Sequence, residues 1–248
     1  MSAPEGAKLR MSIRFRLKGR IPADDPLLQV TPTVPAHQIA PHFVKVDRVG
    51  YSPQYAPTLV GDSVRFDPAT DCNGYFTSSK FQAHNNCYNY ATDIATNTIA
   101  QPGRMNGITI TGNIDAGQVV QGAQRDGLIL AGGHGTGIGG LCNSAPKLGP
   151  GHFVALLIAP AAPALQFDGD YHWVRCDDLG APSWSQKDGP DQVTNFDFAG
   201  SPIHDPAVAH WSVNSGPPGT GKPGAPDLVV TYQFHAYMFV PRAKVIII

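Results

Sequence analysis

The sequence has no long apolar run, little charge and no paired cysteine motif. No run of about 18 apolar residues occurs, so no membrane-spanning helix is predicted. Charged residues make up 15% of the chain and sum to a formal charge of −1, so neither a nucleic-acid surface nor an acidic solvating tail is indicated. Because no apolar segment follows the basic residues of Met1 to Arg20, we expect a protein that is cytoplasmic or exported without a Sec-type signal peptide.

The cysteines are too few and too widely spaced for a metal knuckle or a disulfide scaffold. They are Cys72, Cys87, Cys142 and Cys176. None forms a CxxC pair, and the histidines and acids show no spacing such as HExxH, so we expect no metal and no cofactor. The sequence does not exclude a single disulfide. Gly216–Lys222 has the spacing of a phosphate-binding loop, but Pro223 stands where that motif needs Ser or Thr, and we interpret the segment as a Pro/Gly loop.

Glycine and proline are abundant, at 27 and 23 residues, which indicates many loops around a core that the 42% hydrophobic content can fill. We expect a loop-rich N-terminal extension over 1–70, with one strand at 11–19, and a compact domain over 71–248. One helix followed by many strands favours the α+β class. The pattern predicts a helix at 87–95 and strands at 128–131, 152–158, 170–177, 192–198, 228–240 and 244–248, with weak strand patches at 108–111 and 118–121, a flexible loop at 132–140 and turns at 180–189.

Cys87 stands at the predicted start of the helix and is the candidate nucleophile. Asn85 or Asn86 can cap this helix, and its dipole favours a thiolate at the first turn. The same turn directs backbone N–H groups toward an oxyanion formed at the sulfur, and the amides of Gln82 and Asn86 are candidate side-chain donors. The alternative interpretation is that Cys87 is a small buried hydrophobic residue.

His152 is the candidate general base. It follows Gly149-Pro150-Gly151 and opens the most apolar strand of the chain, where a turn can expose the ring. His134 lies in the predicted glycine loop, which is too flexible to fix an imidazole. His172, on the next predicted strand, is the main competitor.

A helix-head cysteine, a Gly-His-apolar strand and further antiparallel strands resemble the papain-like cysteine hydrolases. That superfamily includes NlpC-type and CHAP amidases and several bacterial effectors. Gln82 lies five residues before Cys87, close to the oxyanion glutamine of papain-type enzymes, although the Cys-Gly-[SA]-Cys-[WY] signature is absent. The resemblance spans roughly residues 80–200 and implies a papain-like core with the cysteine helix packed on an antiparallel sheet.

The resemblance also implies a third residue that orients His152. NlpC-type enzymes use a second histidine on the next strand, here His172, whereas papain-like enzymes use Asn or Asp, here Asn195 or Asp197. The expected function is thiol-dependent hydrolysis of amide bonds in a peptide, protein or peptidoglycan substrate, as a peptidase, an amidase or a deamidase, in a protein that fits an exported bacterial effector. The alternative is a non-enzymatic, β-rich binding or structural module with an inert Cys87.

Overall fold

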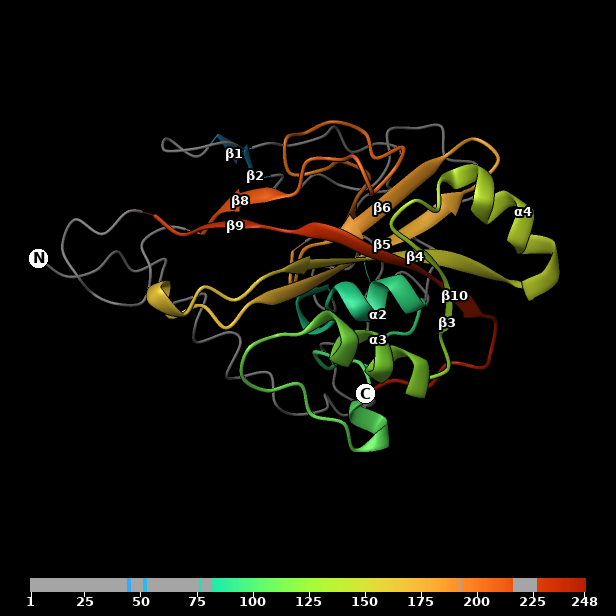
Figure 1. Ribbon diagram of the computed structural model, residues 1–248, viewed down its shortest axis with the longest axis horizontal. Helices are drawn as coiled ribbons and strands as arrows, with labels where there is room; N and C mark the ends of the chain where they lie inside the picture. Colours follow the sequence, from blue (N-terminus) through green and yellow to red (C-terminus); the bar gives the residue numbers. More distant parts are fainter. Residues whose placement is uncertain (1–43, 46–50, 53–75, 77–81, 192, 216–226) are drawn as a thin grey trace, which may run out of the picture.

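The central element of the protein is a six-stranded antiparallel sheet with the strand order β3-β10-β4-β5-β6-β7 (Figure 1). The computed structural model describes residues 44–45, 51–52, 76, 82–191, 193–215 and 227–248. The six strands are β3 (Ile129–Gly133), β4 (Gly151–Ala159), β5 (Asp170–Asp178), β6 (Ser183–Lys187), β7 (Val193–Thr194) and β10 (Gln233–Pro241). Two strand pairs lie outside this sheet: β1 (Val44–Lys45) with β2 (Tyr51–Ser52), and β8 (Ser212–Asn214) with β9 (Val229–Thr231).

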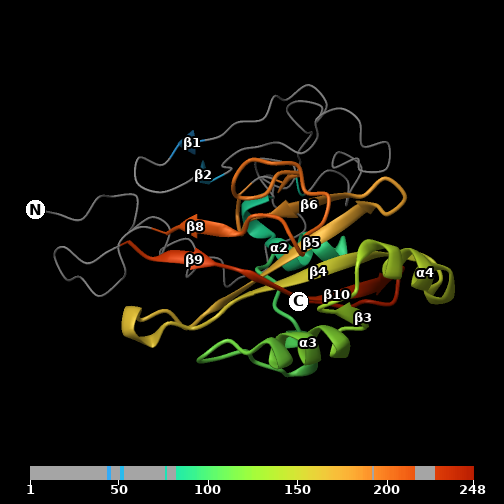
Figure 2. The same ribbon diagram turned by 45° about the horizontal axis from the view of Figure 1, so that its top comes forward.

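The helices cover both faces of the sheet (Figure 2). They are α2 (Cys87–Thr92), α3 (Ala116–Arg125) and α4 (Ile138–Leu148), with short 3-10 turns at Gln82–His84, Arg104–Asn106 and Pro163–Leu165. Helices α2 and α3 pack on one face, which we call the α2 face, and α4 packs on the other, the α4 face. The α+β class is therefore confirmed.

Alternation along the central strands divides the core into two apolar layers. In β5, Trp173 packs on the α2 face, whereas Val174 and Cys176 pack on the α4 face. The same period of two puts Val154 and Leu156 of β4 against α2. The sequence pattern therefore predicts both these strands and their two faces.

Other predicted elements are wrong because tertiary burial outweighs local propensity. The strand patch expected at 118–121 is part of α3, whose first turn is capped by the Asp115 carboxylate and whose Val119 and Ala123 are buried. The glycine-rich loop expected at 132–140 is shorter than predicted: β3 extends to Gly133 and α4 begins at Ile138, so the turn spans 134–137, and fully buried Leu141 anchors the helix to the α4 face.

Three further predictions also fail, and two predicted ranges lie outside the described residues. The range 180–189, expected to form turns, contains β6, and 108–111 does not form the expected strand. The C-terminal residues 244–248 do not form the expected strand either, and they run beside the end of α3 and the turn at Gln101. The strand expected at 11–19 and the loop at 216–222 fall outside the described residues. Within the part of the chain that the structure describes, no helix has the length and hydropathy needed to cross a bilayer.

A buried amide network determines where α2 begins and ends. The Asn86 side chain accepts from the backbone N–H of Asn89, and the Asn89 side chain accepts from that of Asn86, which forms a capping box. Asn89 also accepts from the Ala100 N–H and donates to Ile94 O and Thr96 Oγ1. All of the hydrogen-bonding capacity of this buried amide is therefore used within the protein.

Replacing Asn89 with Ala should reduce the free energy of unfolding by about 3 kcal/mol, because several buried partners lose their hydrogen bonds together. Urea denaturation followed by circular dichroism measures this change. The control is Gln124→Ala on the exposed face of α3, which should change stability by less than about 0.5 kcal/mol. Equal losses in the two variants would show that the network does not hold α2.

Candidate functional site

Cys87 occupies the first position of α2 as predicted, but its thiol lies in the apolar core. The residue is 6% exposed and packs with Ala91 and Val154 on the α2 face. Burial raises the pKa of the thiol to about 12, and a hydrogen bond from the Trp173 backbone opposes that rise only in part. A six-residue helix does not offset this desolvation, so the neutral thiol is the stable form at physiological pH.

His152 lies on the same face of the sheet as Cys87 but bonds to the other end of α2. Its Nε2 is 2.7 Å from the carbonyl oxygen of Ala91, and because that oxygen can only accept, Nε2 carries the proton. Burial, with added repulsion from the Arg175 and Arg242 guanidinium groups, lowers the pKa of the imidazole to about 4. The hydrogen bond that positions this ring is therefore made to the helix backbone.

His152 lines a cleft of about 590 Å³ at the C-terminal end of α2. Buried Arg175 is 3.5 Å from Asp93 and 3.4 Å from Asp177, and its guanidinium lies 4.4 Å from the centre of the Tyr90 ring. This cluster of charges was not predicted from the sequence. Its signal in the sequence is the pair Arg175 and Asp177, which strand alternation puts on the same face of β5 as Trp173.

The ion pairs of this cluster connect α2 to the sheet. The Tyr90 hydroxyl lies 2.6 Å from Ser185 Oγ, and Ser185 donates in turn to Asp177. The positive charge of Arg175 is therefore balanced by carboxylates within the fold, and a neutral imidazole borders them. Within the described ranges, no group of three His, Cys, Asp or Glu side chains is arranged to hold a metal ion.

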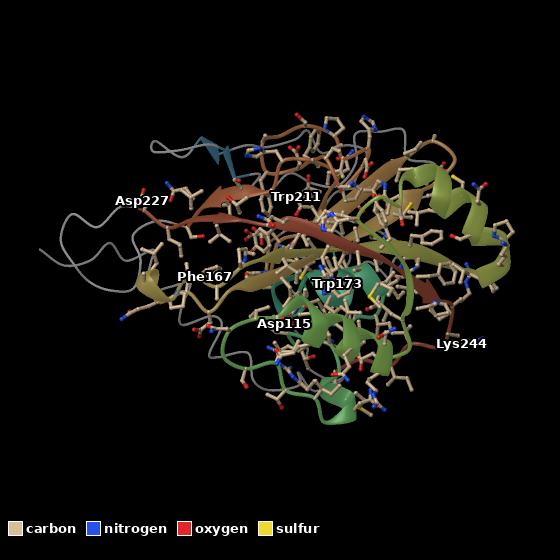
Figure 3. The ribbon with its side chains drawn as sticks, in the orientation of Figure 1. Asp115, Phe167, Trp173, Trp211, Asp227 and Lys244 are labelled. Carbon is tan, nitrogen blue, oxygen red and sulfur yellow. The ribbon has the colours of Figure 1, made fainter. Side chains whose placement is uncertain are left out.

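His172 lies on the opposite face of the sheet from Cys87 and His152, so it cannot orient His152. Its Nε2 lies 2.6 Å from Oε1 of Gln186. The centroids of three aromatic rings lie 5.8–6.0 Å from the centroid of the imidazole, and these belong to Phe198, Trp211 and Tyr232. Figure 3 shows the separation, with Trp173 toward α2 and Trp211 on the other side of the sheet. Burial lowers the pKa of His172 to about 4, so it is a neutral core residue.

Asp197 and Asn195 also lie away from the thiol, in the chain segment after β7. The Asp197 carboxylate accepts from the backbone N–H groups of Ala199, Ser201 and His210 at 2.9–3.0 Å. It therefore organises a loop and does not contact His152. The buried Oδ1 of Asn195 has no hydrogen-bond partner among the described residues, and its backbone carbonyl accepts from Ile203.

The two predicted oxyanion donors do not form a pair at the sulfur. Asn86 caps α2, and its amide NH₂ donates to the carbonyl of Ala100 at 2.7 Å, so this amide is committed to structure. Gln82 lies in a separate 3-10 turn, where its buried Oε1 has no partner among the described residues. The Asn86 amide therefore holds the start of α2, and Gln82 takes no part in that cap.

Lys187 is a further buried residue that the sequence analysis missed. It is fully buried on β6, and its Nζ donates to the carbonyl of Gly189 at 2.7 Å. Burial lowers the pKa of its amine to about 7, even though the charges of Asp191 and Asp188 act to raise it. The one indication of this burial in the sequence is strand alternation, which puts Lys187 on the same face of β6 as Ser185.

Cys87 should react with iodoacetamide at pH 8 roughly 100-fold more slowly than exposed Cys142 in the same native protein. Burial restricts access, and the raised pKa keeps the sulfur protonated. Peptide mass spectrometry separates the two sites, so Cys142 is the internal control. Labelling of Cys87 at the rate of Cys142 would contradict an inert thiol.

Stability should fall as pH is lowered from about 6.5 toward 4, because the unfolded chain binds protons at His172 that the folded chain does not. The lowered pKa corresponds to about 3 kcal/mol for this buried ring. A His172→Gln variant should have a shallower pH dependence of the urea midpoint, whereas His210→Gln at an exposed site should behave as the wild type. Identical slopes in all three proteins would rule out this proton linkage.

Comparison with known proteins gives one informative relationship. No protein-family model matches the chain, and no solved structure matches it. The chain is 38% identical over 147 residues to insoluble matrix shell protein 1 of Ruditapes philippinarum, a match that covers 59% of this chain and 81% of that protein. The relative is named as an insoluble component of a shell matrix. The relationship therefore contradicts the predicted thiol-dependent amide hydrolase and favours the structural alternative.

Proposed function

The chain belongs to the same family as insoluble matrix shell protein 1, and from this we propose that it is a non-enzymatic structural module of an insoluble, exported protein matrix. The similarity of the two chains, which extends over most of the relative, is the observation that carries the proposal.

The buried polar residues of the protein support a structural role. Asn89, Asp197 and His172 are held by hydrogen bonds within the fold. Such internal satisfaction stabilises one conformation and leaves these groups little capacity to bind a substrate. The residues that resembled catalytic groups act here as caps, loop organisers and core packing.

We also propose that the scaffold is a papain-like core that has no thiol chemistry. A helix with a cysteine at its head packs on an antiparallel sheet, and the strand that carries His152 is central in that sheet. The raised pKa of Cys87 and the hydrogen bond from His152 to Ala91 fit a scaffold in which nucleophile and base are no longer coupled.

Fractionation of the source tissue tests the structural role. The chain should be found in the extracellular material that stays insoluble in detergent, and recombinant full-length Cys87→Ala should sediment as the wild type does. Cys142→Ala is the matched control, because it removes an exposed cysteine at no cost to the core. Recovery of the chain only in the soluble fraction, with Cys87 labelled by a thiol-directed activity probe, would overturn the proposal.

A further inference from the structure

The strand β3 forms one end of the six-stranded sheet and has β10 as its single neighbour among the described strands. Both views place β3 at the margin of the sheet beyond β10 (Figures 1 and 2). An edge strand presents a row of backbone N–H and C=O groups that a further strand can pair with. The edge of β3 is therefore a surface that a partner strand can extend.

The side chains at this edge are apolar and exposed. Ile129 and Leu130 are 41% and 50% exposed. The C-terminal segment lies beside the start of β3, where the backbone N–H of Ile246 donates to the carbonyl of Asp126. It adds two further exposed side chains, Ile246 at 62% and Ile248 at 42%. Four of the seven large exposed apolar side chains of the described residues thus belong to these two adjacent segments, a concentration typical of an interaction surface.

The composition of β3 fits a second copy of itself. Natural sheets protect a free edge with lysine, proline, an inward-pointing charge or a β-bulge. Ile129–Gly133 contains none of the first three, and its one protective feature is a bulge at Ala131. Because the strand is uncharged, antiparallel pairing of two copies opposes no like charges. A partner recognised by charge would find no complementary group on this strand, which favours self-association.

A two-fold axis through Ala131 gives the register with the greatest overlap. It places Ile129 of one copy opposite Gly133 of the other, and Leu130 opposite Gly132. A side chain built on Gly133 would meet nothing closer than His235 O at 3.7 Å, so there is room above this glycine for the partner's Ile129. The space above Gly132 is instead filled by the Thr136 side chain, whose Oγ1 lies 2.5 Å from where a Cβ would stand. The pairing of Ile129 with Gly133 is therefore self-complementary in shape, whereas the partner's Leu130 would lie against Thr136.

The β-bulge in β3 limits the strength of the contact. The pairing of β3 with β10 shifts register at Tyr237/Met238, which makes Ala131 the extra residue. A bulge increases the local twist and shortens the stretch that can pair regularly. Pairing over five residues therefore gives a weak contact, which forms at the high local concentration of a matrix.

We propose that β3 pairs antiparallel with β3 of a second copy of this chain, joining two six-stranded sheets into one continuous sheet of twelve strands. This inference rests on the proposed structural function and gives that function a surface and a partner. A contact about a two-fold axis closes on itself, so it defines the paired building unit of the matrix, and growth of the matrix uses other surfaces.

Sedimentation velocity of the full-length chain over a concentration series tests the pairing. The wild type should form dimers, and Leu130→Lys should weaken dimerisation at least about 10-fold because it puts like charges at the paired edge. Val208→Lys is the matched control, since Val208 is 82% exposed and lies outside β3. Ile129→Thr, which preserves strand propensity, gives a second readout if Leu130→Lys fails to fold, and it too should weaken the dimer.

Disulfide trapping tests the register directly. In a Cys142→Ser background, Ala131→Cys should give a disulfide-linked dimer with diamide as oxidant, whereas Val208→Cys should not. A wild type that stays monomeric, a dimer that Leu130→Lys and Ile129→Thr leave intact, or equal trapping at both positions would overturn the pairing. Each of these results is compatible with a chain found in the insoluble fraction, so failure of the pairing is distinguishable from failure of the proposed function.

Discussion

The reciprocal hydrogen bonds between Asn86 and Asn89 are the constraint on which the α2 side of the structure depends. They start the helix at Cys87, and through Ala100 and Ile94 they tie it to the loop that follows. Once α2 is held in this position, the thiol faces Ala91 and the sheet, in an apolar layer. The burial of the Cys87 thiol thus follows from the hydrogen bonds of Asn86 and Asn89, which fix the position of α2.

The sheet itself is a partition between two separate cores. His152 and Cys87 lie on one side, and His172, with its aromatic neighbours, lies on the other. Strand alternation alone puts Trp173 on one face of β5 and His172 and Val174 on the other, as they lie in the structure. Alternation does not predict which face of β5 meets α2, since that choice depends on contacts between residues far apart in the chain, such as Tyr88 with Trp173.

The residues that the sequence pointed to do occupy defined structural positions, but the similarity to insoluble matrix shell protein 1 does not favour the catalytic roles expected for them. The cap at Asn86, the apolar strand after His152 and the period of two in β5 follow from local rules and could be predicted. Helix α4 could not, because two glycines obscure a helix that fully buried Leu141 stabilises through tertiary contacts. The raised pKa of the Cys87 thiol could not be predicted either, because it results from burial, whereas the sequence indicates only that a helix begins at this residue.

The unequal accessibility of the cysteines has a consequence for how the protein ages under oxidation. Among the three described cysteines, Cys87 and Cys176 are enclosed by the core, and Cys142 on α4 is exposed. Oxidants reach accessible sulfur first. Among the described sulfur atoms, oxidation is therefore expected to start at Cys142 on α4 and at Met105, which is 55% exposed, before it reaches the cysteines within the two cores.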